Sequence, residues 1–330
     1  MKIAILDDYQ DVVRHLPCFE LLRGHDIKVF NNRAVGIGQL AIRLAAFDVL
    51  VLNRERTTLT KALLKKLPKL KLIAQTGKVS GHIDVFAATE LGITIVEGIG
   101  NSTAPAELTW ALIMASSRKI NQYANNLQDG LWQTASTIPA NNGLGRVLHQ
   151  RTLGIWGYGR IGKIVAGYGK AFGMHIRIWG SAASCSLAEQ DGYQIAISKE
   201  SFFAQSDIIS MHLRLSDRSR GIVSTNDLAS MKADSLFVNT SRAELLQAGA
   251  LETALTLGHP GYAAIDVFEA EPVSKLNPLL QMENVLATPH LGYVEQTSYE
   301  LYFRAAFQNI LDYANGNPKN VLSPDLHNYL

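Results

Sequence analysis

The stretch Gly154-Ile155-Trp156-Gly157-Tyr158-Gly159-Arg160-Ile161-Gly162 decides the fold of this chain. It continues a β-rich apolar run that starts at Thr152, and it opens a helical pattern that runs to Phe172. A Gly-x-Gly-x-x-Gly pattern at a strand-to-helix turn indicates dinucleotide binding, whereas the same pattern elsewhere is a structural glycine turn. The first glycine permits the tight turn, the second lets a pyrophosphate approach the backbone, and the third lets helix and strand pack closely. Helix N–H groups would hold the phosphates. We therefore predict cofactor contacts by Gly157, Tyr158, Gly159, Arg160, Ile161 and Gly162.

Strands alternate with helices on both sides of this turn. Before it, the apolar runs that predict strands are 2–6, 27–30, 48–52, 71–75 and 93–96. From the turn onward, the predicted strands are 152–156, 175–179, 193–197, 207–212, 235–239, 261–265 and 285–288. Such alternation implies βαβ units, and therefore parallel sheets covered by helices on both faces.

The chain is too long for one ordinary core, because 330 residues correspond to two domains of about 150 residues. We predict an α/β protein with two Rossmann-like or flavodoxin-like, doubly wound parallel-sheet domains and a cleft between them. Residues 1–102 plus 292–330 are expected to form a substrate-binding domain, and residues 103–291 an NAD(P)-binding Rossmann domain. The polar segment 121–151 is predicted to be an irregular arm that packs on another subunit.

Composition excludes several classes of function. The 31 basic residues exceed the 29 acidic ones by only two, so we expect no nucleic-acid partner. No apolar stretch reaches the length of about 18 residues that a membrane span needs. Cys18 and Cys185 have no ligand-like spacing, so neither a disulfide framework nor a metal site is predicted. The chain starts as a strand, without a signal-peptide pattern, which favours a cytoplasmic protein.

The predicted second strand of the nucleotide domain lacks the acid that usually follows it. NAD-binding folds place Asp or Glu there, roughly twenty residues past the glycines, to hold the adenosine ribose. Here Gly180 and Ser181 follow Trp179. Without a carboxylate, a 2′-phosphate would not be repelled and Ser181 could donate to it, but no Arg or Lys follows until Lys199. NAD is the expected cofactor and NADP remains open.

Three segments place chemically useful residues at the predicted carboxyl ends of strands. They are Val238–Arg242, Asp266–Pro272 and Thr288–Gly292. Histidine suits proton exchange near neutral pH, and a carboxylate bonded to its other nitrogen fixes its tautomer. Arginine pairs bidentately with a carboxylate. Because ligands of open α/β sheets bind at that edge, the three segments together predict a site for hydride transfer to a 2-keto acid.

With these motifs, the sequence resembles the D-isomer-specific 2-hydroxyacid dehydrogenases over nearly its whole length. The resemblance implies that Arg242 binds the substrate, that His290 is the acid/base, and that Glu271 is its carboxylate partner. It also implies that Asp266 contacts the nicotinamide carboxamide. Further cofactor contacts are implied for Ser181, His212 and Thr240. A homodimer formed through the nucleotide domain is expected.

A loop in the first domain, Thr76–Asp84, resembles the family loop whose N–H groups hold the substrate carboxylate. Gly77, Lys78 and Val79 are therefore expected to bind the substrate. Lys78 departs from the family, which commonly has an apolar residue there. It either favours an acidic or phosphorylated substrate tail or points to solvent.

We therefore predict an NAD(P)-dependent D-2-hydroxyacid dehydrogenase, an oxidoreductase that acts on the CH–OH group of a D-2-hydroxy acid. The first alternative is D-3-phosphoglycerate dehydrogenase proper. The second is a protein of another class, an NAD(H)-sensing binding protein similar to the corepressors that resemble this family.

Overall fold

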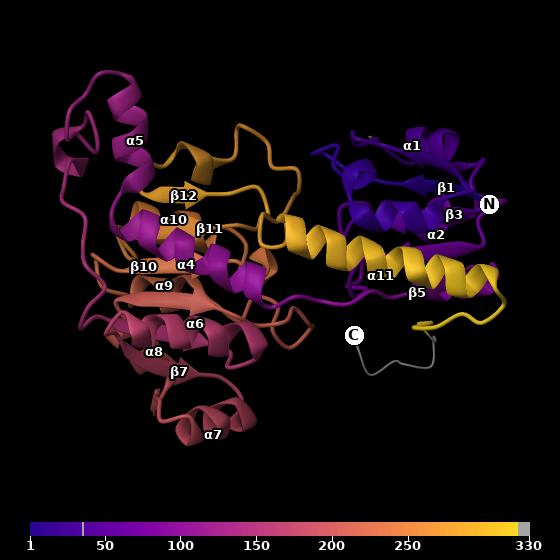
Figure 1. Ribbon diagram of the computed structural model, residues 1–330. Coiled ribbons are helices and arrows are strands. Elements are labelled where there is room, and N and C mark those ends of the chain that lie inside the picture. Colours follow the sequence, from indigo (N-terminus) through magenta and orange to yellow (C-terminus); the bar gives the residue numbers. More distant parts are fainter. Residues whose placement is uncertain (35, 323–330) are drawn as a thin grey trace. The chain divides into compact units, whose positions relative to one another are not determined.

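The glycine stretch follows strand β6 (Thr152–Trp156) in a seven-stranded sheet of the computed structural model, which describes residues 1–34 and 36–322 (Figure 1). The strand order is β12-β11-β10-β9-β6-β7-β8, and neighbouring strands are parallel. The other strands are β7 (His175–Trp179), β8 (Gln194–Ile195), β9 (Ile208–Met211), β10 (Leu236–Asn239), β11 (Tyr262–Ile265) and β12 (Val285–Ala287). The predicted strands of this region and the parallel α/β class are confirmed, although β8 is shorter than expected.

Helices cover both faces of this sheet because successive strand residues point to opposite sides. Ile155 of β6 packs with residues of α4 (Thr103–Ser117) and α6 (Arg160–Ala171). Its neighbour Trp156 packs on the opposite face with Phe202 and Phe203. That face is covered by α8 (Lys199–Gln205), α9 (Thr225–Ala229) and α10 (Ala250–Thr256), and α7 (Ala182–Gln190) lies beside β7 and β8.

The prediction of an irregular arm is wrong for residues 121–128, which lie in helix α5 (Ile120–Gln128). Lys119 adopts a left-handed conformation with φ of 51° and separates this helix from α4. The nine described residues of α5 include none that is buried, so the helix lacks the buried apolar stripe that marks most helices in a sequence. The rest of the arm is irregular, apart from the short 3-10 helix η3 (Pro139–Asn141).

A second parallel sheet belongs to a separate unit, which comprises Met1–Asn101 and the chain from Val294 onward. The unit that contains the seven-stranded sheet is Ser102–Tyr293. The second sheet has the order β2-β1-β3-β4-β5, with β1 (Lys2–Ile5), β2 (Asp26–Val29), β3 (Val49–Leu52), β4 (Leu72–Gln75) and β5 (Thr94–Val96).

This five-stranded sheet is also covered on two sides. One face carries α1 (Gly36–Leu44), α2 (Lys61–Leu64) and α3 (Val85–Glu90). The other elements of the unit are the 3-10 helices η1 (Val13–His15) and η2 (Pro17–Leu22), and the long helix α11 (Gln296–Ala314). Phe303 and Phe307 of α11 are buried, and Phe307 meets Phe19 of η2 edge to face, with ring centroids 6.3 Å apart. Helix α11 is therefore part of this unit.

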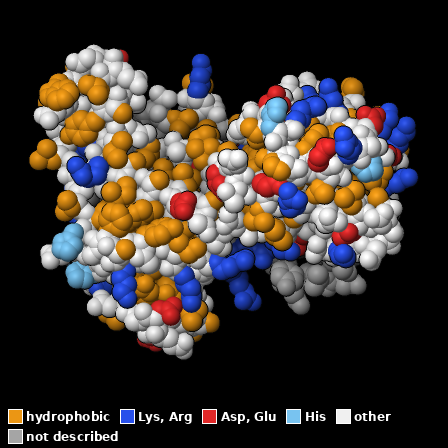
Figure 2. Space-filling model, in the orientation of Figure 1, with side chains coloured by type: hydrophobic (Ala, Val, Ile, Leu, Met, Phe, Trp, Pro, Cys, Tyr) orange, Lys and Arg blue, Asp and Glu red, His pale blue; other side chains and the backbone are white. Residues whose placement is uncertain are grey.

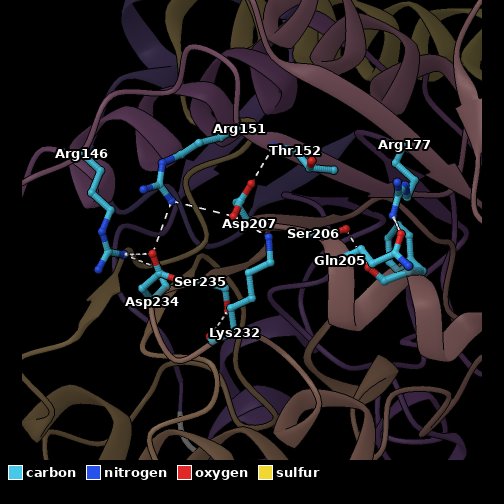
Figure 3. Close-up of polar contacts among 11 residues, drawn as sticks. Arg146, Arg151, Thr152, Arg177, Gln205, Ser206, Asp207, Lys232, Asp234 and Ser235 are labelled. Atoms are coloured by element: carbon cyan, nitrogen blue, oxygen red, sulfur yellow. Dashed lines mark hydrogen bonds and ion pairs between the residues drawn. The ribbon is translucent and has the colours of Figure 1, made fainter.

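Ion pairs join the amino-terminal ends of three strands of the seven-stranded sheet (Figure 3). Asp207, just before β9, accepts the backbone N–H of Thr152 at 2.7 Å and the Lys232 ammonium at 2.8 Å. Arg151 lies 3.9 Å from Asp207 and 3.6 Å from Asp234, which precedes β10. This network, the amino-edge cluster, ties β6, β9 and β10 together at the edge opposite the glycine turn.

Candidate active site

The predicted site residues follow the carboxyl ends of parallel strands, which meet at one edge of the sheet. The glycine turn follows β6, Thr240 and Arg242 follow β10, Asp266 follows β11, and His290 lies three residues past β12. One sheet therefore positions all of these segments, although more than a hundred residues lie between the glycine turn and His290 in the sequence.

The glycine turn is closely packed at its first and third glycines and open at its second. Gly157 has φ of +99°, and a Cβ there would lie 2.6 Å from the His212 carbonyl oxygen. A Cβ on Gly162 would overlap the Gly157 carbonyl oxygen, so helix α6 packs directly on the turn. Nothing lies within 4 Å of the position of a Cβ on Gly159. Gly159 is the N-cap of α6 and provides no side-chain cap, so the first N–H groups of the helix lack the side-chain acceptor that a cap would supply. These residues fit a dinucleotide.

The three side chains of the turn lie in different surroundings. Tyr158 is buried, and its hydroxyl donates to Asp191 at 2.7 Å, so only its backbone is left for a cofactor. Arg160 is exposed, and Ile161 packs at the edge of the core shared with α4. The backbone of this stretch is therefore better placed for phosphates than its side chains.

The end of β7 carries no carboxylate in the position where the ribose is expected. Ser181 caps α7, with its hydroxyl accepting the Ser184 N–H at 3.3 Å. A Cβ on Gly180 would lie 3.3 Å from the Ser184 Cβ, so an acidic side chain at residue 180 would crowd that serine. A side chain at residue 180 would therefore require Ser184 to shift by a few tenths of an ångström.

The side chains of His290 and Glu271 are in hydrogen-bond contact at this edge of the sheet. Nδ1 of His290 lies 2.7 Å from Oε2 of Glu271, whose Oε1 accepts the Phe268 N–H at 3.0 Å. Burial raises the pKa of Glu271, but the hydrogen bond from His290 and the charges of His290 and Arg242 outweigh it, so the pKa lies below the ordinary value. The carboxylate thus stays ionised and orients the imidazole through one nitrogen.

His290 is held in an unusual backbone conformation by a buried carboxylate. Its φ is +53°, in the left-handed region. Asp266, which has no exposed surface, accepts the Thr288 hydroxyl at 2.6 Å and the N–H groups of Leu291 and Gly292 at 2.7 and 2.9 Å. Burial raises the pKa of Asp266, although these donors and the charge of His290 oppose it. Asp266 therefore pins the loop on both sides of His290, a role that the sequence did not reveal.

Arg242 stands near this pair. It is partly buried, its Nη1 donates to the Ser241 carbonyl oxygen at 2.7 Å, and its own carbonyl oxygen accepts the Asn239 side chain at 2.8 Å. Its charge is among the causes that lower the pKa of Glu271. The structure thus brings Arg242, Glu271 and His290, with Asp266, to one place.

The remaining predicted residues of this sheet have structural partners. The hydroxyl oxygens of Thr240 and Thr109 lie 2.7 Å apart, which ties the end of β10 to α4. Nε2 of His212 lies 2.9 Å from the Ser210 hydroxyl. The residue is partly exposed, but the ring is buried at Nδ1, and burial lowers the pKa of His212 to about 4. A neutral His212 cannot supply a proton at neutral pH.

In the unit with the five-stranded sheet, the loop Gly77–Val79 is bound by Glu97, which the sequence analysis did not identify. The Val79 N–H donates to Oε1 of Glu97 at 2.7 Å, and the Lys78 ammonium lies 2.9 Å from Oε2. Arg54, in the left-handed region at φ of 57°, places its guanidinium directly over Gly77, where a Cβ would overlap it. An Arg after a buried strand was the signal that could have identified this second cation.

Two classes of site have no candidate in the part of the chain that the structure describes. No group of three or more His, Cys, Asp and Glu side chains among the described residues could hold a metal ion. No helix within residues 1–34 and 36–322 is long and apolar enough to cross a membrane.

Comparisons with known proteins agree with this geometry. Residues 110–292 match the model of the NAD binding domain of the D-isomer specific 2-hydroxyacid dehydrogenases. A glyoxylate reductase of Aeropyrum pernix is 36% identical over 268 residues, which cover 80% of this chain and 79% of the relative. A phosphoglycerate oxidoreductase structure from Vibrio cholerae is 53% identical with a TM-score of 0.92, covering 96% of this chain and 99% of that one. A D-3-phosphoglycerate dehydrogenase of Methanocaldococcus jannaschii is 37% identical over 255 residues, or 77% of this chain, which spans only 47% of that relative.

Proposed function

Since this chain belongs to the family of D-isomer specific 2-hydroxyacid dehydrogenases, we propose that it exchanges a hydride between a nicotinamide dinucleotide and a 2-keto or D-2-hydroxy acid. The observation that carries the proposal is the 2.7 Å pair of His290 and Glu271, held on a loop that Asp266 pins at the carboxyl edge of the sheet. The same edge carries the open glycine turn. A buried carboxylate and a left-handed histidine backbone are arrangements that a loop without a function rarely retains.

His290 is the proposed acid/base. Glu271 occupies Nδ1, and Nε2 has no hydrogen-bond partner among the described residues, so Nε2 is the nitrogen available to a substrate oxygen. In the reducing direction, protonated His290 donates to the keto oxygen, while Glu271 stabilises the imidazolium until that moment. The bound nicotinamide supplies the hydride. In the oxidising direction, neutral His290 accepts the hydroxyl proton.

Arg242 is the proposed anchor of the substrate carboxylate. A guanidinium pairs with a carboxylate through two parallel hydrogen bonds, which fixes the orientation of the neighbouring keto carbon. Its charge also stabilises the negative charge that develops on the keto oxygen. An Arg242→Ala variant is expected to lose about a hundredfold or more in kcat/KM.

Gly77, Lys78 and Val79 are proposed as the second substrate-binding element. Because the Val79 N–H already donates to Glu97, a substrate carboxylate that takes this donor has to displace a carboxylate of the protein. Glu97→Gln should therefore lower KM for the keto acid, whereas a KM that rises or stays constant would remove Val79 from the substrate site.

The test is a steady-state screen of glyoxylate, hydroxypyruvate, pyruvate, larger 2-keto acids and 3-phosphoglycerate, run with NAD(H) and with NADP(H). Relatives named glyoxylate reductase and D-3-phosphoglycerate dehydrogenase make the first and last of these the reference substrates. Turnover of at least one acid, lost in Arg242→Ala, is the expected result. Tight dinucleotide binding without turnover of any acid would favour the NAD(H)-sensing alternative instead.

D-3-phosphoglycerate dehydrogenase proper is the second candidate, and Arg54 favours it. Lys78 is 67% exposed and its charge is paired with Glu97, so it offers little to a phosphate. Arg54 is also paired, with its Nε 3.6 Å from Oε2 of Glu55, but its guanidinium lies over Gly77 and Arg binds phosphate bidentately, so it is the better cation for an acidic tail. Arg54→Met should raise KM for 3-phosphoglycerate much more than KM for glyoxylate if the tail is phosphorylated.

The proposed cofactor is NAD(H), with NADP(H) as the alternative that the missing carboxylate at Gly180 allows. We also propose a homodimer formed through the nucleotide unit. Figure 2 shows hydrophobic side chains at the surface of the region that contains α5, which supports a contact with another subunit. In the segment 121–151, Leu127, Trp132 and Leu144 are 55%, 76% and 86% exposed. Trp132→Ser and Leu144→Ser together should shift sedimentation of the chain toward the monomer. We propose a cytoplasmic location, and we propose neither a membrane nor a nucleic acid as a partner.

A further inference from the structure

Helix α7 is held to its sheet by little apolar packing. Among its nine described residues, Ala182–Gln190, Ala188 alone is buried. Figure 1 shows the helix at the outer end of the seven-stranded sheet, beside β7. Buried apolar surface stabilises by about 25 cal/mol per Å², so one alanine side chain fixes the helix only weakly. Its position must depend on other contacts.

A single carboxylate supplies such a contact and joins α7 to the glycine turn. Asp191 follows the last residue of α7, and its Oδ2 accepts the hydroxyl of Tyr158 at 2.7 Å. The ammonium of Lys163, in the first turn of α6, lies 3.2 Å from the same oxygen and 5.2 Å from the centroid of the Tyr158 ring. Tyr158 itself is 3% exposed. One carboxylate oxygen, at the end of α7, therefore contacts both the glycine turn and α6.

The charge states favour this contact over a wide pH range. The hydrogen bonds from Tyr158 and then Lys163 lower the pKa of Asp191. Burial, and then the hydrogen bond to Asp191, raise the pKa of Tyr158. The phenol therefore remains a donor, and the carboxylate an acceptor, at neutral and alkaline pH. A hydrogen bond to an ionised acceptor is roughly twice as strong as a neutral one.

The two ends of α7 adjoin different parts of a bound dinucleotide. Its first residues follow Gly180 and Ser181, at the end of β7 where the adenosine ribose is expected. Its last residue adjoins Asp191, which is tied to the turn that would hold the pyrophosphate. We propose that Tyr158 is a positioning residue, whose hydrogen bond to Asp191 fixes the ribose-binding end of α7 relative to the phosphate-binding turn. This inference rests on the proposed dinucleotide binding.

If Tyr158 has this role, loss of its hydroxyl weakens the binding of ligands that contact both the ribose site and the glycine turn. Ligands that contact the ribose site alone bind as before. The test is isothermal titration of the full chain with ADP-ribose, which spans ribose site and turn, and with adenosine, which reaches only the ribose site. Tyr158→Phe should raise Kd for ADP-ribose by about 5- to 20-fold and Kd for adenosine by less than about 2-fold. KM for NAD(H) should rise more than kcat falls.

Tyr193→Phe is the matched control. The ring of Tyr193 meets that of Tyr158 edge to face at 5.8 Å, and its hydroxyl has no hydrogen-bond partner among the described residues. This variant should bind both ligands as the wild type does. Asp191→Ala removes the same acceptor and also the partner of Lys163, so it should weaken ADP-ribose binding at least as much as Tyr158→Phe. The double variant should be no weaker than Asp191→Ala, because Tyr158→Phe removes a bond that Asp191→Ala has already lost.

Wild-type affinity of Tyr158→Phe for ADP-ribose would overturn the inference. An equal loss of affinity for adenosine and ADP-ribose would also overturn it, since that result indicates a general disturbance of the fold. Additive losses in the double variant would show that the two residues act separately and would exclude the proposed contact. A wild-type chain that does not bind ADP-ribose would instead count against the dinucleotide site itself.

Discussion

The two edges of the seven-stranded sheet both carry buried or partly buried charges, yet only one of them has the features of a site. At the amino edge, Asp207 and Asp234 are paired with Arg151, Lys232 and a backbone N–H (Figure 3). At the carboxyl edge, the imidazole of His290 is held through one nitrogen only, on a left-handed backbone.

The difference teaches that charge density does not identify an active site. In the amino-edge cluster the acidic side chains are paired with basic side chains of the protein, and these ion pairs connect β6, β9 and β10. The carboxyl edge uses Asp266 and Glu271 to orient a third group, His290, whose remaining nitrogen has no hydrogen-bond partner in the described part of the chain. An oriented group with unused hydrogen-bonding capacity is what a reaction requires.

The largest expected effect is at His290. His290→Ala removes the proposed proton donor and should lower kcat for keto-acid reduction by about 10²- to 10⁴-fold, measured by steady-state kinetics. His82→Ala is the control, because Nε2 of His82 lies 3.3 Å from Gln75 in the other unit and no proton transfer is proposed for it. Equal losses in both variants would contradict the assignment of the acid/base.

Glu271→Gln should have the next largest effect, roughly a hundredfold in kcat. The pKa of Glu271 is low, so the wild-type carboxylate is ionised throughout the neutral range and stabilises protonated His290. An amide lacks that charge and cannot stabilise a protonated imidazole in the same way. The loss should appear in kcat for keto-acid reduction, measured by steady-state kinetics, and a wild-type kcat in the variant would exclude the pair.

Thr288→Val should cost about tenfold in kcat. The change removes the 2.6 Å hydrogen bond to buried Asp266 but nearly keeps the shape of the side chain, and a hydrogen bond to a charged group contributes about 1.5–3 kcal/mol. Thr256→Val, on an exposed helix turn, is the matched control and should leave kcat unchanged. A Thr288 variant with normal kcat would show that the loop keeps its conformation without this bond.

At the amino edge, Asp207→Asn should change stability and leave the reaction alone. We expect a loss of about 1–3 kcal/mol in the free energy of unfolding, with kcat within about 2-fold of the wild type. Burial raises the pKa of Asp207, but the bonds from Lys232 and Thr152 and the charge of Arg151 lower it below the ordinary value of 3.8.

The pH dependence of this variant follows from that shift. A group with a lowered folded-state pKa stabilises the fold above its ordinary pKa and loses that contribution as pH falls through the folded pKa. The difference between wild-type and Asp207→Asn denaturant midpoints should therefore be complete at neutral pH and shrink below pH 3.8. A large loss of kcat at neutral pH would erase the distinction between the two edges.

The sequence predicted most of the strands because each is a short apolar run between turn or helix signals. It also brought Arg242, Glu271 and His290 to one edge, since parallel strands determine where their carboxyl ends lie. It missed α5, whose side chains are not buried. The clamp of Asp266 on Thr288, Leu291 and Gly292 was also missed, because it depends on three-dimensional contacts that no spacing encodes.

The five-stranded unit shows the same limit. The loop Gly77–Val79 was found by its motif, but its partners Glu97 and Arg54 come from two other segments of that unit. The position of Arg54 after a buried strand could have indicated a cation, but nothing near Arg54 or Glu97 in the sequence indicates their contacts with the loop. The sequence therefore identified the residue types that the chemistry needs, and the structure was required to show which carboxylate each one meets.

We propose that the carboxyl edge of the seven-stranded sheet carries out the proton step and that the amino edge does not. Single-turnover reduction of an active 2-keto acid, followed by nicotinamide absorbance, tests it most directly when wild type, His290→Ala and Asp207→Asn are compared with dinucleotide bound to all three. We predict equal rates for wild type and Asp207→Asn, and a rate lower by about a hundredfold or more for His290→Ala. A wild-type rate in His290→Ala would contradict the account.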